Sequence, residues 1–95
     1  MQVIGLLTLQ DLKNRHADVR TQVDAWLSEV EIAKWDSPQD IKSRYPSASI
    51  LSDNQVVFNL KGNKYRVLAK IGYKRKIISV QKAGTHAEYS KWKLK

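Results

Sequence analysis

The sequence has 95 residues, no cysteine, and a formal net charge of +8 at pH 7. This length suits one domain with a single modest core, which we expect over residues 1–95. The lack of cysteine excludes disulfides and thiolate metal sites, and it fits a reducing cytoplasm. No apolar run approaches the roughly 18 residues that span a bilayer, and the start MQVIGLLTLQ lacks the basic region of a signal peptide. We therefore expect a cytoplasmic protein without a membrane partner.

The positive charge is concentrated in the second half of the chain. Residues 1–53 contain six Lys or Arg and eight Asp or Glu, for a net charge of −2. Residues 54–95 contain eleven Lys or Arg and a single acid, Glu88, for a net charge of +10. A basic surface of this kind favours a polyanionic partner, most often nucleic acid. The alternative is a solvated lysine-rich surface that only aids solubility.

The first half of the chain predicts a short strand and two helices. The apolar run QVIGL at residues 2–6 is typical of a strand. Thr8 is the expected N-cap of a short helix, TLQDLKNRH. From Val19 onward, apolar residues recur at i, i+4, i+7, i+8, i+11 and i+14, which predicts an amphipathic helix of about four turns. Trp26 lies on this apolar stripe, and we expect it and Trp35 to be core residues rather than base-stacking platforms.

A third, short helix is expected before the sheet. Ser37 is its predicted N-cap with Pro38 at the first helical position. Tyr45 ends it, because the following Pro46 disfavours helical backbone there. Residues 47–54 then have the composition of a loop, which ends in a turn at Asp53-Asn54.

Residues 54–89 predict three antiparallel strands followed by a capped turn of helix. A loop at residues 61–64 pairs Leu60 with Tyr65 and Asn59 with Arg66, and it gathers apolar side chains on one face. We interpret that face as core, and we interpret the opposite face as the working surface, formed by Val57, Asn59, Arg66, Leu68 and Lys70. A second loop at residues 72–75 pairs Ile71 with Lys76, Ala69 with Ile78 and Val67 with Val80.

His86 follows this sheet at the start of the helical turn. Thr85 and Glu88 have the spacing of a capping box, so His86 is expected at a helix N-terminus, where free N–H groups favour an anion. A histidine titrates near neutral pH, and an arginine such as Arg66 binds phosphate through two parallel hydrogen bonds. Together they could cleave RNA without a metal: one group takes the 2′-hydroxyl proton, Arg66 stabilises the phosphorane, and another group protonates the leaving 5′-oxygen. The alternative is a His86 without a role.

Two motifs in this half resemble the HigB family of type II toxin–antitoxin mRNA interferases. The first is VFNLKGNKYRVLAKI, residues 57–71, and the second is GTHAEYSKW, residues 84–92. The segment SPQDIKSRYPSAS is also similar to a helix followed by aromatic-Pro-Ser in that family. The resemblance implies an α+β, RelE-like fold, in which N-terminal helices pack on a small antiparallel sheet with a short C-terminal helical turn. It also implies cleavage of mRNA on translating ribosomes and neutralisation by a HigA-type helix-turn-helix antitoxin.

By this resemblance, Arg66 and His86 are the leading catalytic candidates, and Tyr89 and Lys64 are alternatives for proton transfer. We expect no cofactor and no metal site. The candidate RNA contacts are the polar and basic residues of the sheet and its loops: Asn59, Lys61, Asn63, Lys70, Lys74, Arg75, Lys76 and Lys82. A non-catalytic RNA-binding module that uses the same basic face is the main alternative. A DNA-binding protein ranks lower, because no predicted helix has the basic exposed face of a recognition helix.

Overall fold

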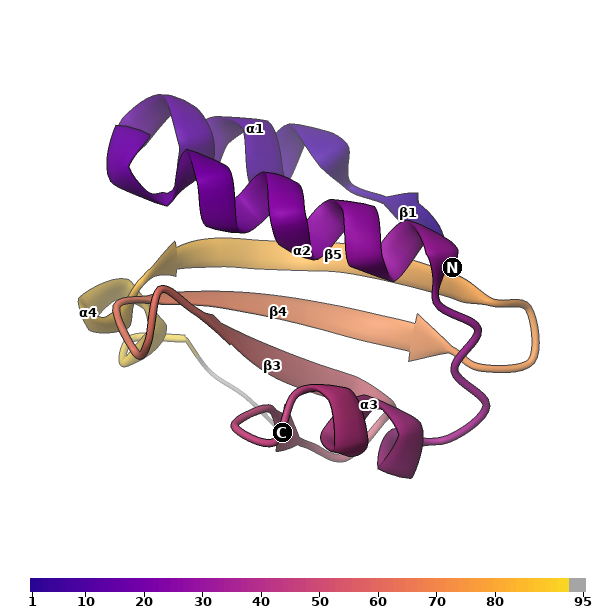
Figure 1. Ribbon diagram of the computed structural model, residues 1–95. Coiled ribbons are helices and arrows are strands. Elements are labelled where there is room, and N and C mark those ends of the chain that lie inside the picture. The colour runs from indigo at the N-terminus through magenta and orange to yellow at the C-terminus, as the bar shows by residue number, and fades with distance from the viewer. Residues whose placement is uncertain (93–95) are drawn as a thin grey trace.

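A computed structural model of the protein describes residues 1–92 (Figure 1). Its helices are α1 (Leu6–Arg15), α2 (Arg20–Ile32), α3 (Pro38–Arg44) and α4 (His86–Tyr89), with a 3-10 turn at Ala17–Val19. Its strands are β1 (Gln2–Ile4), β2 (Ser49–Ile50), β3 (Gln55–Leu60), β4 (Tyr65–Gly72) and β5 (Ile77–Thr85). Helices α1 and α2 lie side by side over one face of the sheet. None of the helices in residues 1–92 is long and apolar enough to cross a membrane.

Within the described residues, the strands form one sheet in the order β1-β5-β4-β3-β2. The expected antiparallel pairing is confirmed for β3, β4 and β5, and β1 adds a parallel pairing with β5, which makes the sheet mixed. The expected loop at residues 47–54 also contains the two-residue strand β2, which pairs with β3. Both additions lie at sheet edges and involve strands of only three and two residues, which are too short for local alternation to reveal their pairing.

The first predicted hairpin is confirmed and the second is shifted. Leu60 pairs with Tyr65 and Asn59 with Arg66, as expected. Between β4 and β5, however, Ile71 pairs with Ile78, two residues from the prediction, because the loop is Tyr73–Lys76 and Gly72 still pairs with Ile77. A shift of two keeps the side chains of β5 as far as Val80 on their predicted faces, so this part of the apolar face survives the error.

A β-bulge in β5 changes the register further along the same pair of strands. The pairing shifts between Leu68 and Ala69 of β4, so that Val67 lies opposite Ala83 and Arg66 lies opposite Gly84. A bulge opposes two residues on one strand to one on its partner. Here it moves the end of β5 by one residue and brings the start of α4 beside Arg66.

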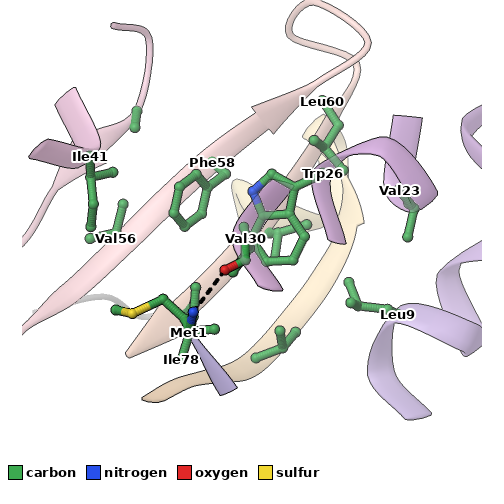
Figure 2. Close-up of a cluster of buried hydrophobic side chains, with 14 of the residues drawn as sticks. Met1, Leu9, Val23, Trp26, Val30, Ile41, Val56, Phe58, Leu60 and Ile78 are labelled. Carbon is green, nitrogen blue, oxygen red and sulfur yellow. Dashed lines mark hydrogen bonds between the residues drawn. The ribbon is translucent and has the colours of Figure 1, made fainter. Parts of the chain in front are cut away.

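The core lies between α1, α2 and the sheet (Figure 2). Phe58 of β3 is at its centre and is fully buried. The ring centroid of Trp26 lies 5.2 Å from that of Phe58, and the ring of Trp35 stacks on Phe58 at 6.1 Å. Ile41 adds the apolar side of α3 to this cluster. The prediction that both tryptophans are core residues is therefore confirmed.

Helix α1 begins two residues earlier than predicted. Its N-cap is Gly5 rather than Thr8, which lies in the first turn and donates its N–H to the Gly5 carbonyl at 3.1 Å. Gly5 has φ +90°, and a Cβ at this position would lie 2.4 Å from the Val80 carbonyl oxygen. The close approach of the chain to β5 therefore requires glycine there. In contrast, α3 has the predicted Ser37 N-cap and Pro38, although the Ser37 side chain makes no capping bond.

The face opposite the core is less open than predicted. Val57 and Leu68 are 0% and 3% exposed, although neither belongs to the core cluster. Asn59 and Arg66 are half-buried, and Lys70 is exposed. The predicted working surface thus has a buried apolar centre with polar groups at both ends.

Candidate active site

Arg66 lies at the centre of a cluster that contains four of the predicted site residues. Its Nη1 donates a hydrogen bond to Oδ1 of Asn59, directly across the β3–β4 pair. Its Nη2 lies 3.0 Å from Nδ1 of His86. Its guanidinium carbon is 4.9 Å from the centre of the Tyr89 ring, a cation–π distance. We define these residues, Asn59, Arg66, His86 and Tyr89, as the Arg66 cluster.

The Arg66 cluster is oriented from the strand side by a backbone group. Nδ2 of Asn59 donates to the Ser47 carbonyl at 2.9 Å. Because the amide nitrogen is held there, the amide oxygen faces Arg66, where it accepts from the guanidinium. Ser47 precedes β2, so the unpredicted strand helps to place this amide.

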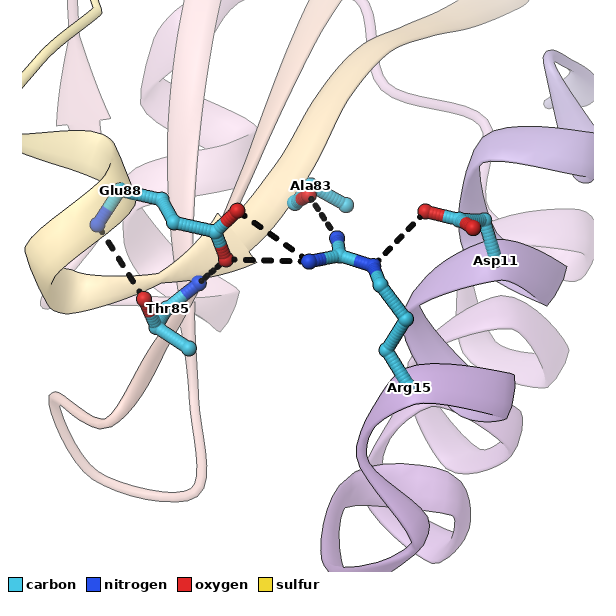
Figure 3. Close-up of polar contacts among 5 residues, drawn as sticks. All are labelled: Asp11, Arg15, Ala83, Thr85 and Glu88. Carbon is cyan, nitrogen blue, oxygen red and sulfur yellow. Dashed lines mark hydrogen bonds and ion pairs between the residues drawn. The ribbon is translucent and has the colours of Figure 1, made fainter.

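From the helix side, the cluster is positioned by the predicted capping box, which is confirmed (Figure 3). Oγ1 of Thr85 accepts from the Glu88 N–H at 3.1 Å, and Oε1 of Glu88 accepts from the Thr85 N–H at 2.9 Å. Arg15 of α1 reaches over and donates Nη1 to the Glu88 carboxylate at 3.2–3.3 Å. The Thr85 N–H and then Arg15 lower the pKa of Glu88. Helix α4 is thus tied both to its own N-cap and to α1.

The N-terminus of α4 has fewer free donors for an anion than predicted. The His86 N–H donates to the Lys64 carbonyl at 3.0 Å, and the N–H groups of Thr85 and Glu88 are used within the capping box. These bonds position His86 through the β3–β4 loop and leave few donors at this N-terminus for a phosphate.

The contact between Arg66 and His86 has a direct consequence for proton transfer. A guanidinium has donors only, so Nδ1 of His86 is the acceptor in this contact. The proton of the neutral ring is therefore on Nε2. The side chain of His86 is exposed, which leaves the ring accessible to a substrate.

The Lys64 ammonium does not join the Arg66 cluster. It lies 3.1 Å from Oδ2 of Asp18, which also accepts from Lys61 at 3.2 Å. The hydroxyl of buried Tyr65 donates to the other oxygen of Asp18 at 2.6 Å. The bond from Tyr65, followed by those from the two lysines, holds the pKa of Asp18 well below its usual range. In turn, the Asp18 carboxylate raises the pKa of Tyr65 to about 12. Lys61 and Lys64 are therefore engaged with the 3-10 turn before α2.

Several other candidate RNA contacts are also paired with acids of the first half. Lys70 lies 3.4 Å from Oδ2 of Asp53. Lys76 donates to the Trp35 carbonyl at 3.1 Å and to the Asp36 carboxylate. The remaining candidates in the loops and on β5 are exposed: Asn63, Lys74, Arg75 and Lys82. The ammonium of Lys82 lies 5.9 Å from the centre of the Trp92 ring.

Sequence reasoning missed Arg15 and Trp92 as neighbours of the site. Arg15 is separated from Glu88 by 73 residues, so no local pattern links them. Trp92 packs edge-on against Tyr89 at 5.6 Å. The aromatic spacing of Tyr89 and Trp92, three residues apart after a capping box, is the one sequence signal for this contact.

Comparison with known proteins gives the family of the chain. Residues 19–92 match the family profile described as HigB toxin, RelE-like toxic component of a toxin–antitoxin system. The chain belongs to the HigB toxin family. The α+β arrangement of helices packed against a five-stranded mixed sheet in the described residues agrees with the RelE-like fold of this family. The resemblance of the two motifs at residues 57–71 and 84–92 is thereby confirmed.

Curated relatives of this HigB-family toxin carry a more specific name. The chain is similar to the mRNA interferase toxin HigB of Escherichia coli strain K12, with 25% identity over 91 residues, covering 94% of this chain and 88% of the relative. The mRNA interferases HigB of Escherichia coli O157:H7 and Shigella flexneri show the same identity and coverage.

Proposed function

We propose that this toxin is a metal-independent endoribonuclease that cleaves mRNA with the Arg66 cluster. The observation that carries the proposal is the 3.0 Å contact between the Arg66 guanidinium and the His86 ring. A phosphate-binding cation and an imidazole, which can accept or donate a proton, meet there on the basic half of the chain. The names of the relatives, which are mRNA interferases, support RNA as the substrate.

The chemistry follows from the donors and acceptors of the cluster. Each terminal nitrogen of Arg66 has a second N–H beyond those used by Asn59 and His86. When a phosphate draws the guanidinium away from His86, Nδ1 is released as a proton acceptor. One group then takes the 2′-hydroxyl proton, the 2′-oxygen attacks phosphorus, and a second group protonates the leaving 5′-oxygen. Arg66 stabilises the charge of the phosphorane, which is greatest in the transition state.

We also propose the cellular setting of this reaction. The toxin acts in the cytoplasm on mRNA bound to translating ribosomes, and a HigA-type helix-turn-helix antitoxin neutralises it. Membership of a toxin family in toxin–antitoxin systems supports an antitoxin partner. Induction of the toxin alone should stop growth, and co-expression of the adjacent gene should restore it. Normal growth with confirmed folded toxin would contradict this setting.

The catalytic assignment is tested by cleavage of a reporter mRNA in a purified translation system and on free RNA. Arg66→Ala should lower cleavage by about 10² or more, with a smaller loss of RNA binding. His86→Gln should lower it by about 10²-fold and flatten one limb of the pH–rate profile. Lys64→Gln is the matched control, because its ammonium lies at Asp18 rather than at Arg66.

The outcomes separate the rival assignments. If His86→Gln cleaves like wild type while Arg66→Ala is inactive, proton transfer passes to Tyr89. Loss of cleavage in Lys64→Gln would assign it to Lys64. If both main variants cleave normally, the Arg66 cluster is not the catalytic site. A wild-type protein that binds RNA without cleaving it would favour the non-catalytic RNA-binding module. Thermal melts of each variant confirm that the fold is retained.

A further inference from the structure

A shallow hollow of about 350 Å³ lies on the same face of the sheet as Arg66, at the other end of β4. Arg66 and Lys70 are separated by four residues on one strand, so their side chains share this face. Buried Leu68 lies between them. The volume is at the lower end of small-ligand sites. The hollow is lined chiefly by Lys70, Gly72, Arg75, Ile77, Ser79 and Gln81.

The floor of the hollow is formed by two neighbouring residue pairs of β4 and β5. Gly72 has no side chain, and its partner across the strand pair is Ile77. The neighbouring pair joins Lys70 to Ser79. Gly72 and Ile77 therefore give the floor an apolar part that can contact the face of a nucleobase.

The rim of the hollow adds cations and an amide. Arg75 is exposed and has no carboxylate within 4 Å among residues 1–92. The Lys70 ammonium makes one long contact, 3.4 Å, to Asp53. The Gln81 side-chain oxygen accepts from Gln55 at 3.1 Å, which leaves its NH₂ group as a donor. Two cations complement a phosphate, and a side-chain amide complements the edge of a base.

We propose that this hollow is a second RNA subsite, which binds one nucleotide of the substrate strand away from the scissile phosphate. The proposal rests on the function proposed for the Arg66 cluster, because that cluster fixes where the strand is cut. Four residues of β-strand span about 13 Å. A stacked strand rises about 3.4 Å per nucleotide, so the subsite lies roughly four stacked nucleotides from the scissile phosphate, and fewer if the strand is extended.

Gly72→Val tests this subsite by filling its floor. Gly72 does not have a left-handed φ, and a Cβ there would meet only Ile77 atoms at 3.6–3.9 Å, which is ordinary contact. Valine also favours strand conformation, so we expect the fold and its melting temperature to be retained. Ser28→Val, on the exposed side of α2, is the matched control for an added apolar side chain.

The measurement is the affinity for 2′-O-methyl RNA, which lacks the 2′-hydroxyl nucleophile and therefore reports binding alone. Gly72→Val should weaken binding of an octanucleotide about tenfold, as expected for the loss of one stacked base. Binding of a dinucleotide, too short to reach both sites, should not change. In wild-type protein, the octanucleotide should shift the amide resonances of Gly72 and Ser79, a readout that needs no variant.

Equal octanucleotide affinity in Gly72→Val and wild type, or unshifted Gly72 and Ser79 amides, would overturn the proposal. An effect of Gly72→Val that appears only with ribosomes would also overturn it, because the hollow would then bind ribosomal RNA. Failure of the catalytic proposal looks different. In that case wild-type protein cleaves no RNA, yet it still binds the octanucleotide more tightly than Gly72→Val does.

Discussion

Arg15 is expected to act as a positioning residue for RNA cleavage, because its guanidinium bonds the Glu88 carboxylate of α4 and, at 3.5 Å, the Ala83 carbonyl of β5 rather than a member of the Arg66 cluster (Figure 3). Helix α4 has four residues, far fewer than an isolated helix needs to be stable in water. Its docking therefore depends on its capping box and on Arg15. Replacing Arg15 with Gln removes the charged contact to α1 and leaves the capping box in place.

The size of the effect follows from the exposure of the pair. The side chains of Arg15 and Glu88 are 40% and 43% exposed, and exposed pairs contribute about 0.2–1 kcal/mol. If that energy holds α4 in place, its loss lowers kcat by between about 1.4-fold and fivefold. KM should change little, since Arg15 is not part of the Arg66 cluster. The same energy corresponds to a fall in melting temperature of a few degrees, at about 4–8 °C per kcal/mol.

The assay is a double-mutant cycle of Arg15→Gln and Glu88→Gln, read in kcat and in thermal melts. Glutamine at position 88 still completes a capping box, so this substitution removes only the charge. Arg15→Lys should restore part of the rate. Asp11→Asn is the control, because Asp11 pairs with Arg15 at 2.9 Å on α1 without touching α4. Additive effects in the cycle, or equal slowing by Asp11→Asn, would refute the positioning role.

The cycle also has a pH signature. The folded-state pKa of Glu88 is lowered, so the ionised carboxylate stabilises the fold at pH values above its unfolded pKa of about 4.3. That stability is lost as the pH falls through the lowered folded-state value. Arg15→Gln should therefore weaken the dependence of the melting temperature on pH below about 4.3.

Two further predictions concern groups outside the Arg66 cluster. Replacing exposed Lys74 and Arg75 with Ala should reduce the log–log salt slope of RNA binding, by up to about 0.7 for each lost phosphate contact. Lys76→Ala should leave the slope unchanged, because Lys76 is bound to the α2–α3 connection. This prediction is contradicted if Lys76→Ala lowers the slope as much as the replacement of Lys74 and Arg75 does. Asp18→Asn should lower the pKa of Tyr65 from about 12 toward 10, measured as tyrosinate absorbance during a pH titration, and an unchanged titration would exclude the hydrogen bond as the cause.

The sequence was most informative where structure is determined by nearby residues. The loop at residues 61–64 and the alternation of apolar residues place Asn59 opposite Arg66, because the register of a hairpin follows from its turn. The capping box from Thr85 to Glu88 places His86 at the start of α4. These two local patterns account for most of the Arg66 cluster.

The errors arose where distant segments meet. The excess of lysines in the second half of the chain gave no sign that the ammonium of Lys64 would bind the carboxylate of Asp18, which is far from the β3–β4 loop in the sequence. Thr8 had the better capping side chain, but contact with β5 moved the start of α1 back to Gly5. In β5, the inward residues Val80 and Ala83 are three apart instead of two. This spacing of three indicates the bulge, but the prediction assumed a strict alternation of inward and outward residues and therefore missed it.

The bulge divides β5 into two segments, and the alternation of inward and outward side chains in one segment is independent of that in the other. On one side, Ser79 lines the hollow beside Lys70; on the other, Gly84 lies opposite Arg66 and leads to His86. A one-residue insertion or deletion at the junction would exchange inward and outward side chains in only one of these segments. A single-residue change at the bulge would therefore move the residues that lead to His86 relative to those that line the hollow, while the β4–β5 pairs on the other side of the bulge keep their register.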